Sequence, residues 1–480
     1  MDFVKENKWV IIVSALICAL CIAFVWHDNW ILYFIPFALI AIYGAIFYTE
    51  VAFLALFFLT PISINIEEFV EGIGLFVPTE PLLAGLMMLI LAQQLKKPFI
   101  QFNILKNQLS WAILFYLLWI FISCITSSHP LVSFKFLLAK LWFVIPMILY
   151  GTMIFQERKN IKTALWLFCV GMILAMLYTL TMHASYQFGE KEGHWVMSPL
   201  FKDHTIYGAM VAFNLPLLVG LYVSKKHSAL IQALLLGFII INFVALYFSY
   251  TRAAWLSIIV AFGVWSIIKL KIRFSVLALG TISLGLIVYF SWTAIQHNLE
   301  KNKSEHTTEE FGKRLESVSN VTTDASNLER LNRWSCAMDM FNERPIFGFG
   351  PGTYAFEYAR FQRPENLTII STNFGDLGNA HSEYLGPMAE TGIIGLISVL
   401  ILITFIFYLG ITLYLKWDEN DREMRSLLMA MILALVTYFF HGILNNYWDT
   451  DKASVPIWAF CAIFMALTHQ TTNGFLSKKD

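Results

Sequence analysis

The sequence predicts an all-α, polytopic integral membrane protein of about fourteen transmembrane helices, or about twelve if the weakest pair is not real. Hydrophobic residues make up 58% of the chain and charged residues only 14%, well below the share that is usual in soluble domains. Apolar runs long enough to cross a bilayer recur almost from end to end. These two observations exclude a soluble enzyme. The net charge of +0 says nothing about nucleic acid, and we expect no nucleic-acid partner for a membrane protein of this kind.

The expected spans are apolar runs of about 20 residues. The first follows Lys5 and Lys8 as a signal peptide would, but no small-residue cleavage site comes after it, so we expect an uncleaved helix. The second and third spans are nearly fused. In order, the spans lie near 9–26, 30–48, 51–64, 80–95, 109–126, 131–154, 161–182, 205–223, 228–248, 252–269, 274–294, 393–415, 426–446 and 454–470.

Basic residues in the short loops predict the orientation of these helices, because cytoplasmic loops are enriched in lysine and arginine. One alternation satisfies every loop: both termini are cytoplasmic and the segment 295–391 is periplasmic. The chain then divides into transmembrane helices (1–294), one large periplasmic loop with amphipathic helices (295–391), and the last helices with a cytoplasmic C-terminus (392–480). The cytoplasmic basic residues include Lys96, Lys97, Lys106, Arg158, Lys159, Lys162, Lys225, Lys226, Lys269, Lys271, Arg273, Lys416, Arg422, Arg425, Lys478 and Lys479.

This topology restricts the chemistry. No cytoplasmic loop exceeds about a dozen residues, so that side has no room for a nucleotide-binding fold. The chain also has no phosphate-binding loop of the form G-x-x-x-x-G-K-[ST]. Any reaction is therefore expected on the outer side, without a nucleotide, and with a donor that reaches the site on a lipid.

Three cations lie where a membrane disfavours them. Lys135 and Lys140 fall within the span near 131–154, and Arg252 opens the span near 252–269 on the outer side. Lys135 can extend to the outer surface, and Arg252 can be an interfacial anchor. Lys140 lies deeper, where a cation usually faces an interior cavity and meets an anion such as a lipid headgroup. A guanidinium at Arg252 also suits bidentate binding of phosphate.

The outer loop 183–204 contains His183, His194 and His204. Their intervals are too wide for a zinc site, so no metal is expected. Asp203, His204 and Tyr207 lie where the next span begins, a position that can place them at the mouth of a site, although we favour a solvated loop as their explanation.

The stretch from Glu329 to Leu396 is the longest that a membrane cannot absorb. Its first part has an apolar stripe at helical spacing, ended by Pro345, which predicts an amphipathic helix in the membrane interface. Arg330 and Arg333 share the polar flank of this helix, where a headgroup surface would also explain them. The stripe consists of Leu328, Leu331, Trp334, Met338 and Phe341.

Glycines and a histidine follow. The segment IFGFGPGTY contains Gly348, Gly350 and Gly352, but it follows no strand and is therefore no dinucleotide fingerprint. It predicts a tight turn that also lets backbone N–H groups approach a ligand. His381 opens the expected helix HSEYLGPMAE and is the candidate general base, since a near-neutral pKa suits removal of a proton from a sugar hydroxyl.

Three motifs in order, SYTRAAWL, RLNRWSCAMDMFNERPIFGFGPGTY and AHSEYLGPMAETGIIGL, resemble the O-antigen ligase and polymerase family of polyisoprenoid-dependent glycosyltransferases. The resemblance covers roughly 200–446. It implies an inverting, metal-independent enzyme of GT-C type, without a cofactor, in the bacterial inner membrane. The donor would be a glycan on undecaprenyl diphosphate, and membrane lipid would surround the site.

By motif, the resemblance implies that Arg252 and Arg330 hold the diphosphate and that His381 is the catalytic base. Arg333 lies outside the motif. We expect the substrate to be bound by these residues together with Lys135, Lys140, Tyr207, Gly350, Gly352, Glu383 and Tyr384.

The acceptor stays open. A ligase attaches the glycan to lipid A–core, and a polymerase attaches it to another lipid-linked repeat unit. One long loop that holds both the arginine and the histidine motifs favours the ligase. A polysaccharide flippase is a more distant alternative, but transporters tend to contain internal repeats, and this chain has one asymmetric outer loop with no matching half.

Overall fold

The computed structural model of the chain describes residues 43–68, 74–96, 106–224, 227–272, 325–363 and 378–472. The spans expected near 9–26 and 274–294, most of the span near 30–48, and the polar stretch 298–324 lie outside these residues. The described part is almost entirely helical. Besides turns and loops, it contains a two-stranded antiparallel pair in which Ile64 lies opposite Val77 and Asn65 opposite Phe76.

The membrane-spanning part of the described residues contains twelve numbered α-helices, which occupy nearly all of the expected spans there. Their bounds are α4 Thr49–Ile62, α5 Thr79–Lys96, α6 Gln108–Ile125, α7 Pro130–Ile145, α8 Gly151–Ile154, α9 Arg158–Ser185, α10 His204–Ser224, α11 Ala229–Phe248, α12 Arg252–Lys269, α17 Leu385–Lys416, α18 Arg422–His441 and α19 Asp451–Thr472, with the π-helical turn η4 Pro146–Tyr150 joining α7 to α8 in one continuous span. The remaining elements are β1 Ile64–Asn65, η2 Ile66–Glu68, β2 Phe76–Val77, η5 Glu192–His194, α15 Ala325–Glu343, α16 Tyr354–Glu357 and η6 Tyr358–Phe361.

Within these residues, nine helices are long and apolar enough to cross a membrane, and α4 is a shorter apolar helix. The expectation of a polytopic membrane protein is confirmed. The total of about fourteen helices stays a prediction, because three of the expected spans lie wholly or mainly outside the described residues. The 18-residue helix α5 is not among the nine.

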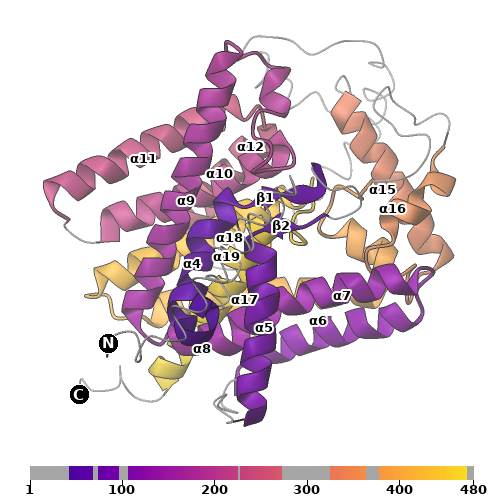
Figure 1. Cartoon of the computed structure of the whole chain (residues 1–480), viewed down its shortest axis with the longest axis horizontal. Helices are drawn as coiled ribbons and strands as arrows, with labels where there is room; N and C mark the ends of the chain where they lie inside the picture. The colour runs from indigo at the N-terminus through magenta and orange to yellow at the C-terminus, as the bar shows by residue number, and fades with distance from the viewer. Residues whose placement is uncertain are drawn as a thin grey trace, which may run out of the picture.

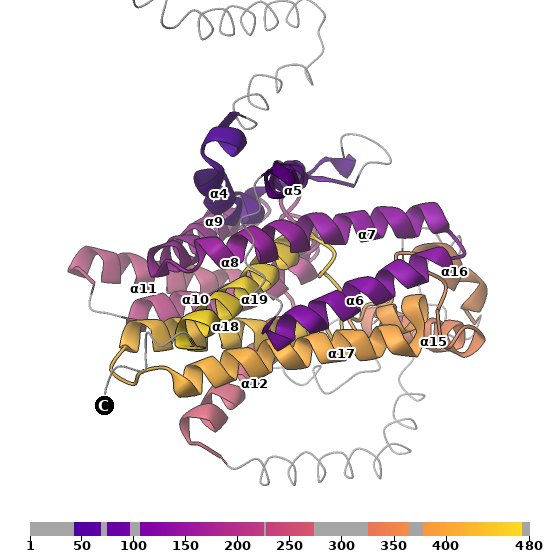
Figure 2. The ribbon, with the colours of Figure 1, turned by 90° about the horizontal axis from the view of Figure 1, so that it is seen from below.

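The central helix of the bundle is α19, whose side chains from Asp451 to Leu467 are all buried. Helices α10 and α18 pack closely against each other, and α6 lies between α7 and α17 (Figure 2). Helices α11 and α12 expose large apolar side chains such as Ile240, Phe243, Ile259 and Phe262. These outward faces suit contact with lipid tails.

Figures 1 and 2 place α15 and α16 at one end of the bundle, beyond the turn that joins α6 to α7. The opposite end carries several of the basic residues that were assigned to cytoplasmic loops. There Arg158 pairs with Asp421 at 2.8 Å, and Lys162 pairs with Glu423 at 3.3 Å. Which end of the bundle faces the cytoplasm stays a prediction from the loop charges.

The helix expected after the polar stretch is present as α15, but its buried face differs from the predicted stripe. Leu331 and Met338 are exposed, at 36% and 43%. The buried side instead carries Glu329, Asn332, Arg333, Cys336 and Met340, most of which pack toward α17 and η6. Leu331 and Met338 of the stripe therefore face outward, the orientation that an interfacial helix needs.

Two expectations near His381 are wrong. His381 does not open a helix, because α17 begins only at Leu385 and His381 has a positive φ of 47°. Helix α17 also starts at Leu385, eight residues before the span expected from 393. Gly392 interrupts its first turns with φ 71° and ψ −168°. A short helical piece thus joins the His381 segment to the membrane span.

Gly392 makes this break possible, because the loop after α15 crosses it closely. A Cβ at Gly392 would lie 2.1 Å from the carbonyl oxygen of Ile346, and the N–H of Ile393 donates to the carbonyl of Pro345 at 2.8 Å. A side chain here therefore meets both a disfavoured φ and a backbone clash.

We predict that Gly392→Ala destabilises the protein by about 1–3 kcal/mol. The measurement is the apparent melting temperature of the full chain in detergent, followed by tryptophan fluorescence. Gly263→Ala in α12 is the matched control, because its Cβ meets nothing within 4 Å and alanine favours a helix. Equal melting of Gly392→Ala and the wild type would show that the crossing carries no such constraint.

Candidate functional site

Polar side chains from four separate segments meet at the end of the bundle that carries α15. They come from the residues before α10, from α15 itself, from the segment 378–384 before α17, and from the turn 441–450 between α18 and α19. The segment 378–384 brings His381, and α15 brings Arg330 and Arg333, both of which act electrostatically on His381. A base candidate and two cations are therefore close together.

His381 is partly buried, and its backbone N–H donates to the side-chain oxygen of Asn379 at 2.9 Å. Burial, reinforced by the charges of Arg330 and Arg333, lowers the pKa of His381 to about 4; Asp203 and Asn445 oppose this shift. The expectation of a near-neutral pKa is therefore wrong for the protein without substrate. The imidazole is neutral at pH 7 and ready to accept a proton, but it is a weak base until the positive charge beside it is offset.

The two arginines have different environments. Arg330 is partly exposed, and its Nε donates to the carbonyl of Leu444 at 3.2 Å. Arg333 is 5% exposed, its Nε lies 2.6 Å from Glu329, and its guanidinium lies 4.1 Å from the ring centre of Tyr358. Arg333 therefore belongs to the surroundings of His381, although it lies outside the sequence motif.

Glu383 holds the His381 segment in place. Its side chain is buried, and its Oε1 accepts from the Tyr438 hydroxyl at 2.6 Å and from the N–H groups of Tyr447 and Trp448 at 2.6 and 2.8 Å. Burial raises the pKa of Glu383 to about 7 despite these donors. Tyr384 adds a bond from its hydroxyl to the carbonyl of Phe439 at 2.9 Å. The side chains of Glu383 and Tyr384 therefore form hydrogen bonds with other parts of the same chain.

The deep lysine has an anion within the protein. The Nζ of Lys140 lies 2.5 Å from Asp449 and donates to the carbonyl of Trp448 at 3.0 Å. The expectation that this cation meets an anion is confirmed, and the anion is a carboxylate of the α18–α19 turn. Lys135, by contrast, is exposed on α7.

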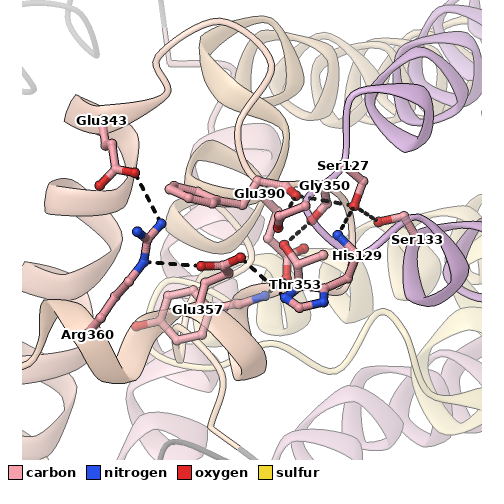
Figure 3. A network of polar contacts seen from close by, with 12 residues as sticks. Ser127, His129, Ser133, Glu343, Gly350, Thr353, Glu357, Arg360 and Glu390 are labelled. Carbon is pink, nitrogen blue, oxygen red and sulfur yellow. Dashed lines mark hydrogen bonds and ion pairs between the residues drawn. The ribbon is translucent and has the colours of Figure 1, made fainter.

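The glycine loop forms a tight turn whose N–H groups bind within the chain (Figure 3). Gly350 donates to the carbonyl of Glu390 at 2.7 Å, and Gly352 and Tyr354 each donate to the carboxylate of Glu390 at 3.0 Å. At Gly350, φ is 112° and a Cβ would lie 2.0 Å from the Oγ of Ser127. These glycines therefore attach the segment that follows α15 to α17 and to the α6–α7 turn.

Figure 3 also shows the outer edge of this attachment. His129 of the α6–α7 turn lies 3.3 Å from Glu357, which pairs with Arg360 at 3.2 Å. Arg360 in turn pairs with Glu343 at the end of α15. Residues 343–361 are thus joined to the bundle by backbone bonds to α17 and by the His129–Glu357 contact, whereas the pairs of Arg360 lie within this segment.

Arg252 and Tyr207 occupy different depths. Arg252 begins α12 and is partly exposed, and the hydroxyl of the preceding Thr251 donates to the carbonyl of His204 at 2.8 Å. Arg252 therefore lies at the same end of the bundle as the residues before α10. Tyr207 is 1% exposed and packs edge-on against Phe201, within the core below that end.

Sequence reasoning missed most of the α18–α19 turn. His441, Asn445, Tyr447 and Asp449 all lie in or beside the site, and Asp203, named only as a residue at a possible site mouth, acts electrostatically on His381, His441 and Tyr447. The available signal was the polar run HGILNNYWDTD between two apolar spans on the outer side. Among the described residues, no group of three or more His, Cys, Asp or Glu side chains is arranged to hold a metal ion.

The geometry combines a neutral imidazole, cations that suit an anionic ligand, and neighbouring hydroxyl, amide and carboxylate groups. The model of the O-antigen ligase family matches residues 237–400, a region that contains Arg252, Arg330 and His381. A search of curated proteins found no match. The family match confirms the resemblance seen in the motifs and, with the apolar helices, supports a multi-pass membrane enzyme of O-antigen ligase or polymerase type.

We predict that His381 stays neutral down to about pH 5 in the protein without substrate, because its pKa lies near 4. Its titration can be followed by nitrogen NMR of histidine-labelled protein, with the signal assigned by its loss in His381→Gln. Arg330→Gln should raise the pKa, because it removes a nearby positive charge, and inorganic diphosphate should raise it in the wild type. Titration near 6.5, unchanged in Arg330→Gln, would contradict this electrostatic picture.

Proposed function

We propose that this chain, whose central region matches the O-antigen ligase family, transfers a glycan from undecaprenyl diphosphate to an acceptor sugar at the periplasmic face of the bacterial inner membrane. The observation that carries the proposal is the placement of His381 beside Arg330 and Arg333 at one end of a helical membrane bundle. Lipid A–core is the acceptor that we favour, and a second lipid-linked repeat unit is the alternative.

In this reaction, the acceptor hydroxyl attacks the anomeric carbon of the donor sugar. The bond from that carbon to the diphosphate oxygen breaks, a new glycosidic bond forms, and the configuration inverts. His381 accepts the proton of the hydroxyl, and Arg330 and Arg252 stabilise the diphosphate as it leaves. No nucleotide, metal ion or cofactor is required, since the energy is stored in the lipid-linked donor.

The low pKa of His381 supports an order of events. Without a donor, the two arginines disfavour a charged imidazole. A bound diphosphate brings negative charge next to them, which favours protonation of His381 and makes it a stronger base. Donor binding would thus activate the base that the acceptor needs, and the enzyme would deprotonate an acceptor only after the donor is in place.

The other expected substrate-binding residues divide into two groups. Lys135, exposed on α7, can contact an anionic lipid headgroup near the outer surface. Lys140, Tyr207, Gly350, Gly352, Glu383 and Tyr384 have partners within the chain or lie in its core, so we propose that they shape the site and do not touch the donor directly.

We predict that His381→Ala lowers glycan transfer by about 10²-fold or more, the range expected when a general base is lost. The measurement is surface glycan on a gel, at matched protein levels in the membrane. His227→Ala is the control, because His227 lies at the opposite end of the bundle, where its ring contacts the carbonyl of Leu221. Normal transfer by His381→Ala would remove His381 from the mechanism.

The lipid-linked glycans that accumulate in the His381→Ala strain identify the acceptor. Long polymer on undecaprenyl diphosphate indicates a ligase, whereas single repeat units indicate a polymerase. A normal pool of lipid-linked glycan on the outer face, with normal surface glycan, would contradict glycosyl transfer altogether.

A further inference from the structure

The turn 441–450 between α18 and α19 presents polar groups that the transfer chemistry leaves without a role. His441 is 1% exposed, yet its Nε2 has no hydrogen-bond partner among the described residues. The side-chain oxygen of Asn446 is likewise buried and unpartnered within that part of the chain. Because burying a polar atom without a partner is unfavourable, such atoms indicate a place where a polar ligand or water completes the bonding.

These groups lie next to the reacting centre. The side chain of Asn445 contacts His381, and both Arg330 and Asp203 act electrostatically on His441. Asn446, Asp203, Thr205 and Arg330 are partly exposed, whereas His441 and Asn445 lie below them with 1% exposure each. Partly exposed polar side chains therefore lie next to buried polar side chains.

The turn is also held rigidly. Glu383 accepts from the N–H groups of Tyr447 and Trp448, and Arg330 donates to the carbonyl of Leu444. The Tyr447 hydroxyl bonds the hydroxyl of Thr205, and Asp203 accepts from the N–H groups of Thr205 and Ile206 at 2.7 and 3.0 Å. The backbone of the turn and the Tyr447 side chain are therefore held in place, which favours preorganisation of a binding site.

We propose that Asp203, His441 and Asn446 form the subsite for the acceptor sugar, and this inference rests on the proposed function. A sugar hydroxyl both donates and accepts hydrogen bonds, and carboxylate, amide and imidazole groups offer both kinds of partner. A diphosphate needs cations, which α15 and Arg252 supply instead. The donor and the acceptor would then meet beside His381, with the diphosphate on the arginines and the acceptor hydroxyls on the carboxylate, amide and imidazole groups.

The test uses the full chain in nanodiscs, with undecaprenyl-diphosphate-linked glycan extracted from a strain that lacks this activity. One arm adds lipid A–core as acceptor, and the other measures growth of the lipid-linked glycan alone. In the active arm, Asn446→Ala and the isosteric Asn446→Asp should raise the acceptor concentration for half-maximal transfer by about three- to tenfold. Their affinity for undecaprenyl diphosphate should stay within about twofold of the wild-type value.

Asn342→Ala, at an exposed position of α15, is the matched control and should behave as the wild type in both measurements. Wild-type acceptor dependence in both Asn446 variants, or an equal loss of affinity for undecaprenyl diphosphate, would overturn the subsite while leaving the proposed function standing. No transfer by the wild-type chain in either arm would overturn the proposed function, and the subsite with it.

Discussion

The arrangement of the site depends on one buried carboxylate. The Oε1 atom of Glu383 accepts three hydrogen bonds, one from the Tyr438 hydroxyl and two from the backbone of the α18–α19 turn. Glu383 lies two residues after His381, so these bonds place the candidate base against the turn that carries Asn445. Without the carboxylate, two buried N–H groups would lose their partner, and each such loss costs about 1–3 kcal/mol.

The same end of the bundle gathers charges that a membrane protein normally keeps apart. Lys140 pairs with Asp449, and Arg333 pairs with Glu329. Arg330 lies beside His381, where its positive charge disfavours protonation of the imidazole. The buried cations Lys140 and Arg333 each have a carboxylate partner, as burial of an ion requires. A bound anion would offset the positive charge that acts on His381. This effect connects the structure to the proposed diphosphate donor.

Local patterns in the sequence predicted most of the helices, because an apolar run of about 20 residues usually forms a membrane-spanning helix. They also predicted α15 and the turn at Gly350. They failed where tertiary contacts decide the local structure. α17 breaks at Gly392 because the loop at Ile346 crosses there, and His381 has a positive φ; no periodicity in the sequence indicates either feature.

The site was predicted in part for the same reason. Arg252, Arg330 and His381 were found through motifs, and the anion that meets Lys140 was expected on physical grounds. Asp449, His441 and Asn446 lie far from these motifs along the chain, so only the packing of α18 and α19 against the outer segment brings them together. The burial of Arg333 likewise depends on packing that the sequence does not show: its guanidinium lies on the ring of Tyr358, although its pairing with Glu329 has ordinary helical spacing.

The central claim is that Arg330 and its neighbours bind the diphosphate of the donor, and affinity for undecaprenyl diphosphate tests it most directly. In the purified full chain, Arg330→Ala should weaken this affinity by about tenfold or more, because a charged hydrogen bond to phosphate is lost. Arg330→Lys should restore part of it through charge alone. Binding of undecaprenol, which carries no phosphate, should not change. Equal affinity of the wild type and Arg330→Ala for undecaprenyl diphosphate would contradict this account.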